Sequence, residues 1–295
     1  MSNYVVAADA EKFLGALKDE SVDLFLIDPP YFKVVRDLWD HQWESAEQYA
    51  GWLVGLLVLA RRKIKPTGSL VMCQAIGKHG QHPLFDVIKG AEKNGWFFRN
   101  WITWKKNRAF GKDDNYLFAR DEIIWFTASE ERGAFTFNPQ WLDERNKRST
   151  KNEFKSVSNV WSDIEQVFRP ERTCRRPMPL IARLIKAHSN EGDLVVDFFS
   201  GYGTTGIVAH NLGRKFLGCE AIEEDAMAAD RRVTAAKESA RSRARKLRPR
   251  ERKSLLGKAQ GKQARAERPP PARARESTDL HDEPSNPQEF RRKRG

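Results

Sequence analysis

The residues best suited to chemistry are Asp28-Pro29-Pro30-Tyr31, which follow the apolar run 24–27. Each proline has a fixed φ angle and no backbone N–H, and a residue that precedes a proline is held extended. The segment therefore offers the Asp28 carboxylate beside the carbonyl of Pro29, with the Tyr31 ring alongside. Two rigid acceptors next to an aromatic ring suit an amino group on a flat heterocycle. Taken alone, the segment also fits a strand that simply ends in a Pro-Pro turn.

A glycine-rich turn lies far downstream. Residues 194–196 form an apolar strand that runs into a G-x-G-x-x-G turn over residues 201–206, and 207–212 continue with helical character. This pattern lets a ligand approach the backbone near a helix N-terminus, although a turn that only joins strand to helix fits it too. A second strand, 215–219, ends at Glu220, which is placed to accept hydrogen bonds from ribose hydroxyls. The order predicts a nucleotide-binding unit.

Charge separates two candidate ligands for this unit. A dinucleotide requires a loop that cradles a pyrophosphate, whereas S-adenosylmethionine has no phosphate but carries an ammonium and a sulfonium. Asp197 at the end of the strand would repel a pyrophosphate and attract these positive groups. The sequence therefore favours S-adenosylmethionine and methyl transfer over a dinucleotide-dependent oxidoreductase.

The order of the two motifs resembles a known family. The Asp-Pro-Pro-Tyr motif precedes the Phe-x-Gly-x-Gly motif of residues 199–203, as in permuted (β-class) DNA amino-methyltransferases. Most of residues 4–225 is similar to the solitary cell-cycle-type adenine methyltransferases. The family usually has Thr-Gln-Lys-Pro where this chain has Cys174-Arg175-Arg176-Pro177, and Asp-Pro-Phe-Ala-Gly-Ser-Gly at residues 197–203, where this chain reads Asp-Phe-Phe-Ser-Gly-Tyr-Gly.

The resemblance implies methyl transfer to N6 of adenine in double-stranded DNA after the base is flipped out. Asp28 and the Pro29 carbonyl would accept the hydrogens of the exocyclic amine, Pro30 would keep the loop rigid, and Tyr31 would stack on the base. N4-cytosine methylation is an alternative with the same chemistry; in the family, Asp at the first motif position is more typical of adenine enzymes and Ser of cytosine enzymes. A non-catalytic DNA-binding protein on this scaffold is an alternative from another class.

The resemblance also implies roles on the cofactor side. Glu220 would hold the ribose, Asp9 the adenine amino group, and Ile222 would pack on the adenine, while the loop would shape the methionine end. The expected cofactor-binding set is Asp9, Asp197, Phe199, Ser200, Gly201, Gly203, Thr204, Thr205, Glu220 and Ile222.

DNA contacts are expected from segments that the scaffold does not require. Basic groups there would anchor phosphates and polar groups would read base edges, although solvated loop charges explain the same pattern. The expected set is Lys105, Lys106, Asn107, Arg108, Lys112, Arg145, Lys147 and Arg148. The target sequence cannot be derived from these residues.

The net charge of +12 is concentrated at the C-terminal end. From Arg231 onward the chain holds 21 of its 52 Lys and Arg but only 8 of its 40 Asp and Glu, so this part carries +13 and the remainder −1. Residues 248–295 contain few apolar side chains and are predicted to be a disordered basic tail. Such a tail suits non-specific phosphate contacts.

Strands alternate with helices, which predicts an α/β fold with a doubly wound, mostly parallel sheet, Rossmann-like and circularly permuted. Aromatic and β-branched runs at 97–105 and 122–127 predict an antiparallel edge hairpin. We expect a catalytic half at 1–128, a target-recognition segment at 129–172 and a cofactor-binding half at 173–247. Ligands in such sheets bind at the carboxyl ends of the strands, next to the switch point.

Three widely spaced cysteines indicate neither a disulfide framework nor a zinc site, and no metal is expected. The chain opens without a signal peptide and contains no apolar run long enough for a membrane span. We therefore expect a cytoplasmic, nucleoid-associated protein with no membrane partner. The resemblance alone implies a possible homodimer. The sequence contains no nuclease motif and leaves open whether a restriction endonuclease partner exists.

Overall fold

The computed structural model describes residues 3–33, 41–76, 81–110, 116–140, 157–166 and 176–246. The chain divides into two compact units, residues 1–243 and 244–295. Of the second unit only the last residues of a helix are described, so the predicted tail at 248–295 lies outside the described residues. Among the helices that are described, none has both the length and the hydrophobicity to cross a bilayer.

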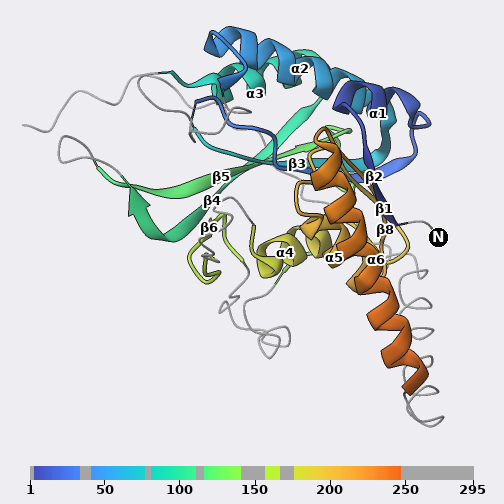
Figure 1. The fold of residues 1–295 in the computed structure, drawn as a ribbon. Coiled ribbons are helices and arrows are strands. Elements are labelled where there is room, and N and C mark those ends of the chain that lie inside the picture. The colour runs from blue at the N-terminus through green and yellow to red at the C-terminus, as the bar shows by residue number, and fades with distance from the viewer. Residues whose placement is uncertain are drawn as a thin grey trace, which may run out of the picture. The chain divides into compact units, whose positions relative to one another are not determined.

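The first unit is built on one eight-stranded sheet, with the order β1-β8-β7-β2-β3-β5-β4-β6 (Figure 1). From β1 to β3 neighbouring strands are parallel, β5 is antiparallel to both β3 and β4, and β6 is parallel to β4. The predicted mostly parallel sheet is confirmed. The strands are β1 Tyr4–Ala7, β2 Val22–Ile27, β3 Ile64–Gln74, β4 Phe97–Phe110, β5 Phe118–Thr127, β6 Val160–Trp161, β7 Leu194–Asp197 and β8 Lys215–Glu220.

Helices cover both faces of the sheet (Figure 1). One face carries α1 Ala10–Ala16, α2 Ala46–Lys63 and α3 Pro83–Lys93; the other carries α4 Met178–His188, α5 Thr204–Asn211 and α6 Glu223–Lys246. Two hydrophobic cores result, one on each side. Because both faces are covered, the central strands are apolar along nearly their whole length and do not alternate.

The sheet order brings the two sequence motifs together. β2 ends at the Asp-Pro-Pro-Tyr motif and pairs directly with β7, which ends at the glycine loop. Leu24 lies opposite Val195 and Phe25 opposite Val196, so this register carries Asp28 to the same edge of the sheet as Phe199. The carboxyl ends of β1 and β8 lie at that edge too, because all four strands are parallel.

The hairpin is longer than the sequence predicted. The polar segment between the predicted strands is partly strand, since Phe110 pairs with Phe118. The outer edge of β4 is also covered by β6, which a run of only two residues did not reveal. Its position is fixed by tertiary contacts: Trp161 is buried, and the Trp104 indole N–H donates to the Ile164 carbonyl at 2.9 Å.

Two stretches of the expected recognition segment are described, 129–140 and 157–166, and the first of them packs against the body of the first unit. Phe135 and Phe137 contact the Trp125 ring, with centroid distances of 5.7 and 5.0 Å. The Asn138 N–H donates to the Ala187 carbonyl at 2.7 Å. Phe135 is partly buried against the core on the α4–α6 side and Phe137 is 46% exposed, while 141–156 and 167–172 lie outside the described residues.

The start of α5 depends on a close approach at Gly206. A Cβ at this position would lie 2.6 Å from Phe216 Cε1 and 2.8 Å from Val233 Cγ2, and both side chains are buried. We expect Gly206→Ala to lower the free energy of unfolding by about 1–3 kcal/mol, because the core must shift to admit the methyl group. Urea denaturation measures the change.

Gly51→Ala in α2 is the matched control, since a Cβ at Gly51 meets nothing within 4 Å. There the substitution should stabilise by about 0.5–1 kcal/mol through helix propensity alone. Equal effects of the two substitutions would contradict the packing argument.

Candidate active site

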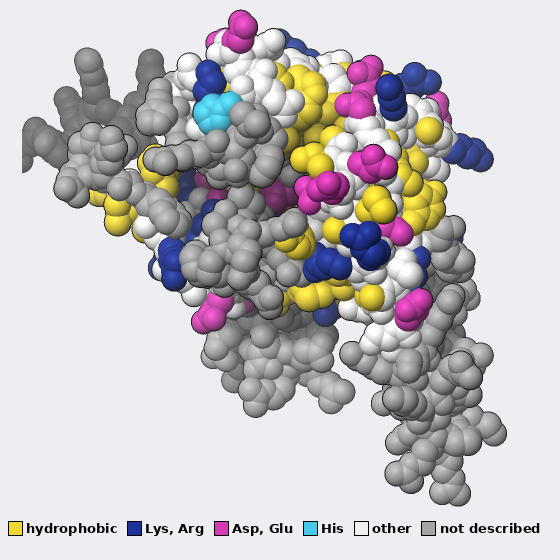
Figure 2. Space-filling model, in the orientation of Figure 1, with side chains coloured by type: hydrophobic (Ala, Val, Ile, Leu, Met, Phe, Trp, Pro, Cys, Tyr) yellow, Lys and Arg dark blue, Asp and Glu magenta, His cyan; other side chains and the backbone are white. Residues whose placement is uncertain are grey.

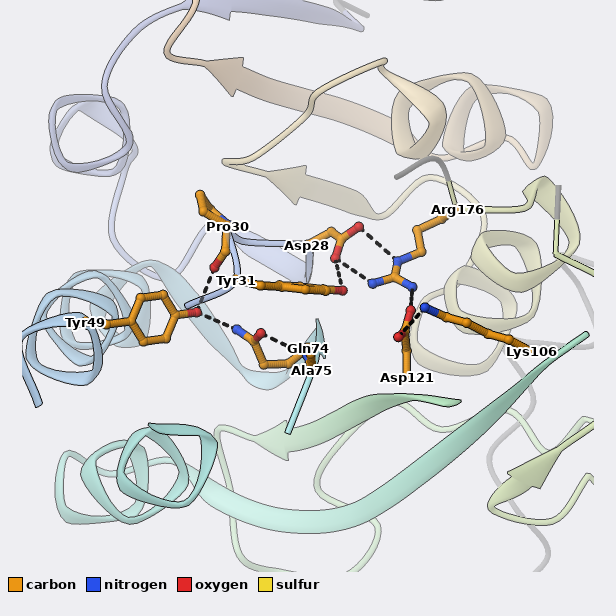
Figure 3. Close-up of polar contacts among 9 residues, drawn as sticks. All are labelled: Asp28, Pro30, Tyr31, Tyr49, Gln74, Ala75, Lys106, Asp121 and Arg176. Carbon is orange, nitrogen blue, oxygen red and sulfur yellow. Dashed lines mark hydrogen bonds and ion pairs between the residues drawn. The ribbon is translucent and has the colours of Figure 1, made fainter. Parts of the chain in front are cut away.

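The loop after β2 is fixed by hydrogen bonds from two other elements (Figure 3). The Tyr49 hydroxyl on α2 donates to the Pro30 carbonyl at 2.8 Å, and the Gln74 amide at the end of β3 donates to that hydroxyl oxygen at 2.6 Å. The Ala75 N–H donates in turn to Gln74 Oε1 at 2.9 Å. Hydrogen bonds therefore fix the loop that carries Asp28. Neither Tyr49 nor Gln74 is a candidate site residue from the sequence alone.

The Asp28 carboxylate is engaged by two side chains. Arg176 donates to it twice, from Nε to Oδ2 and from Nη2 to Oδ1, both at 2.9 Å. The Tyr31 hydroxyl donates to Oδ1, also at 2.9 Å. Burial raises the pKa of Asp28, and the Arg176 guanidinium opposes that rise. Asp28 and Tyr31 belong to one sequence motif, whereas the pair with Arg176 joins residues that no local pattern connects.

A second carboxylate shares the same guanidinium. Arg176 Nη1 donates to Asp121 Oδ2, and Lys106 Nζ lies 2.5 Å from Asp121 Oδ1. Figure 3 shows the guanidinium between the two carboxylates, in a row of alternating charges from Asp28 to Lys106. Burial raises the pKa of Asp121 to about 6, and Lys106 opposes that rise.

The expected DNA-contacting residues do not share one environment. Lys106 is paired with Asp121 and its side chain is only 20% exposed, so it serves the row of charges and is not a solvent-facing phosphate anchor. Lys105, Asn107 and Arg108 are exposed on β4. On the face in Figure 2, Lys and Arg side chains are mixed with Asp and Glu. Outside the described residues lie Lys112, Arg145, Lys147 and Arg148.

The glycine loop is shaped by close contacts with the sheet. Gly201 and Gly203 have φ angles of 44° and 70°, a region that favours glycine. A Cβ at Gly218 in β8 would lie 2.1 Å from Ser200 Oγ, so the loop rests directly on that strand. Gly203 is also the N-cap of α5.

Asp197 organises this loop from inside the protein. It is 3% exposed, its Oδ1 accepts the Phe199 N–H at 3.0 Å, and the Thr205 hydroxyl bonds to it as well. Thr204, Thr205 and Ser200 are likewise buried. Burial raises the pKa of Asp197 to about 7. From the sequence we expect Asp197 to place a negative charge beside the ligand; in the structure this side chain is buried and supports the loop.

Two further carboxylates stand at neighbouring strand ends. Glu220 Oε2 accepts the Gly201 N–H at 2.9 Å, and Oε1 accepts the Ala221 N–H at the same distance. The Ala8 N–H donates to the Glu220 carbonyl at 3.0 Å, which brings the end of β1 beside the end of β8. Asp9 follows β1, caps α1 through Oδ1 and remains exposed.

These surroundings fit an S-adenosyl compound better than a dinucleotide. The Gly201 N–H, which a pyrophosphate would need, is already bonded to the Glu220 carboxylate. Acceptor oxygens of Asp9 and Glu220 lie at adjacent strand ends, and Ile222 beside them is 47% exposed and offers an apolar surface. Within the described residues, no group of three or more His, Cys, Asp and Glu could hold a metal ion.

Aromatic rings connect the two motifs through the core. Trp52 on α2 lies 5.8 Å from the Phe199 ring of the glycine loop and 5.9 Å from the Tyr49 ring. Tyr49 in turn lies 5.8 Å from Phe32, directly after the catalytic motif, while Phe198 contacts Phe25 of β2 at 5.7 Å. The two loops are therefore parts of one packed assembly.

Comparison with known proteins identifies the family. A family model described as DNA methylase, covering N6 and N4 methyltransferases, matches residues 22–231, and the chain belongs to this family. Among curated relatives, the Type II methyltransferase M2.DpnII of Streptococcus pneumoniae is 28% identical over 256 residues, which cover 80% of this chain and 91% of the relative. The Type II methyltransferase M.HpaI of Haemophilus parainfluenzae is 28% identical over 231 residues, covering 76% and 72%.

Solved structures share the fold. TTHA0409 of Thermus thermophilus, in complex with S-adenosylmethionine, matches with a TM-score of 0.57 and 25% identity over 79% of this chain and 93% of that one. The cytosine-N4-specific PvuII DNA methyltransferase matches with a TM-score of 0.59 and 19% identity over the same shares. At 19% identity the likeness to the PvuII enzyme concerns the fold alone.

The burial of Asp197 makes stability depend on pH. Because its pKa is raised from an ordinary value of 3.8 to about 7, its contribution to stability is complete at low pH and is lost as the pH rises from about 4 to 7. We expect the unfolding free energy of the wild type, relative to Asp197→Asn, to fall over this interval. Urea denaturation across roughly pH 4–8 measures it.

Asp163→Asn is the control of opposite sign. Arg183 lowers the pKa of Asp163, so that group stabilises above its unfolded pKa and loses this effect on acidification. Relative to Asp163→Asn, the wild type should therefore gain stability as the pH rises. Parallel pH profiles for the wild type and Asp197→Asn would contradict the burial of a raised-pKa carboxyl.

Proposed function

We propose that this DNA methylase transfers a methyl group from S-adenosylmethionine to N6 of adenine in double-stranded DNA, as a permuted β-class enzyme. The observation that carries the proposal is the pairing of β2 with β7, which sets Asp28 beside the glycine loop. The catalytic motif precedes the cofactor motif in the chain, in agreement with the permuted order.

The cofactor supplies an electrophilic methyl group on a sulfonium centre. The Glu220 carboxylate would hold its ribose hydroxyls and the Asp9 carboxylate its adenine amino group, with Ile222 against the adenine ring. Phe199 to Gly203 would bound the methionine end. Asp197 takes part indirectly, since it sets the shape of this loop.

The residues of the site must activate a poor nucleophile, the exocyclic amine of adenine. The exocyclic amine of adenine is weakly nucleophilic because its lone pair is delocalised into the ring. Acceptance of its two hydrogens by the Asp28 carboxylate and the Pro29 carbonyl would favour the pyramidal nitrogen that forms during attack, and preorganised acceptors act strongly where water is excluded. The braced loop keeps these acceptors in place, which matters for a displacement that depends on positioning.

Tyr31 is held next to the acceptor carboxylate, because its hydroxyl donates to Asp28 Oδ1. This position suits a residue that stacks on the target base. A base inside a duplex cannot reach these groups, so it must rotate out of the helix. Exposed Lys105, Asn107 and Arg108 on β4 would contact the DNA around it.

N4-cytosine methylation is the second candidate, because the PvuII enzyme shares this fold and cytosine also presents an exocyclic amine. The carboxylate of Asp28 favours adenine, since Asp at this position is more typical of adenine enzymes in the family that the chain resembles. Mass spectrometry of nucleosides from methylated DNA distinguishes the two products.

Asp28→Ala should lower methyl transfer at least about 100-fold, because the amine loses its charged acceptor. Transfer of a tritiated methyl group to DNA measures the rate, and calorimetry should show that S-adenosylmethionine still binds. Asp19→Ala, which also removes a carboxylate from a cation, here Lys63, is the control and should retain activity. Undiminished methyl transfer by Asp28→Ala would overturn the role assigned to Asp28. N4-methylcytosine as the product would show that the substrate base is cytosine and not adenine.

A further inference from the structure

Arg176 holds Asp28 from a point 148 residues away in the sequence. Two of its N–H groups reach the two oxygens of one carboxylate, both at 2.9 Å, which is the bidentate geometry of a strong arginine–carboxylate pair. The Arg176 side chain is only 10% exposed. A buried, two-point contact of this kind fixes both the charge and the rotation of the carboxylate.

The pair leaves the carboxylate able to accept another hydrogen bond. An ionised carboxylate has about four lone-pair sites. Oδ1 of Asp28 accepts from Arg176 and Tyr31, whereas Oδ2 accepts, among the residues that the structure describes, from Arg176 alone. One site on Oδ2 is therefore still available with Arg176 in place.

We propose that Arg176 is a positioning residue, which keeps the Asp28 carboxylate ionised and turned so that Oδ2 can accept a hydrogen of the substrate amine. This inference rests on the proposed function and deepens it. Arg176 itself need not touch the substrate; it acts through Asp28.

The surroundings of Arg176 hold it in this position. Nη1 donates to Asp121, whose other oxygen is paired with Lys106, so Asp121 is already balanced and does not draw the guanidinium away from Asp28. The rings of Tyr31 and Trp104 each lie 5.8 Å from the guanidinium carbon. Because lysine carries a single ammonium with no planar fork, it could not serve both carboxylates with the same geometry.

The charged and titratable groups around Asp28 come from several elements. Besides Arg176 they are Tyr31 in its own loop, Cys73 on β3, Lys106 on β4, Asp121 on β5 and Asp197 on β7. Burial raises the pKa of Asp28, and Arg176 is the largest opposing influence, ahead of Lys106. Loss of Arg176 would therefore move the pKa of Asp28 further upward and reduce the ionised fraction at neutral pH.

Two substitutions separate charge from geometry. Arg176→Ala should lower kcat at least about 100-fold and move the acidic limb of the pH–rate profile upward by about one unit or more. Arg176→Lys keeps the charge, so its acidic limb should stay near that of the wild type while kcat falls at least about 10-fold and KM for DNA changes little. Arg183→Lys is the control, because Arg183 on α4 also makes a two-point contact with a carboxylate, that of Asp163. This substitution should change neither quantity.

A direct titration gives a readout that does not require turnover. The ¹³C resonance of the Asp28 carboxyl, assigned by comparison with Asp28→Asn, should titrate at higher pH in Arg176→Ala than in the wild type. An unchanged titration midpoint would overturn the inference. Full activity of Arg176→Lys would also overturn it. Faster methyl transfer by Arg176→Ala would do the same, because it would show that Arg176 inhibits the reaction by occupying the Asp28 carboxylate. A wild-type chain that methylates no DNA would refute the proposed function, and the titration would still decide the role of Arg176.

Discussion

The parallel pairing of β2 with β7 is the contact on which the candidate site depends. Only two residue pairs are in register, Leu24 with Val195 and Phe25 with Val196. The Asp23 carboxylate strengthens the junction by accepting the Leu194 N–H at 2.8 Å across 171 residues of sequence, and Lys65 pairs with its other oxygen. Bringing together segments so far apart in the sequence costs chain entropy. The backbone hydrogen bonds between β2 and β7 extend over a short length. The aromatic packing between the two loops therefore adds stability to this junction.

Electrostatics imposes the second constraint. Asp28, Asp121 and Asp197 all lie in or near the interior, and burial raises the pKa of each. Their partners differ: Asp28 and Asp121 are paired with cations, whereas Asp197 accepts, within the described part of the chain, only hydrogen bonds from Phe199 and Thr205. A buried carboxylate with a matched cation stays charged, and one with neutral donors is easily protonated. The first condition suits a group that must accept hydrogen bonds from a substrate, and the second suits a group that supports a loop.

The sequence predicted the elements better than the contacts between them. Local signals mark the ends of two long helices: Ser45 caps α2 and three basic residues close it, and Pro83 opens α3. The two-residue β6 has no periodicity to read, and its pairing with β4 depends on buried indoles. Lys106 looked like a solvent-facing basic residue because nothing local shows that Asp121 lies across the hairpin. Asp197 looked like a ligand-facing charge because the sequence does not reveal its burial.

The pair between Asp28 and Arg176 also limits which residue types position 28 can hold without a cost in stability. If Asp28 were replaced by a neutral residue such as serine, the buried guanidinium would keep Asp121, which Lys106 already neutralises, as its charged partner. A buried cation that loses its partner is costly, so the two positions are energetically coupled. The residue type at position 28 therefore depends on Arg176, the cation that a distant part of the chain places beside it. A change at Asp28 alone would therefore disturb the charge balance of the site.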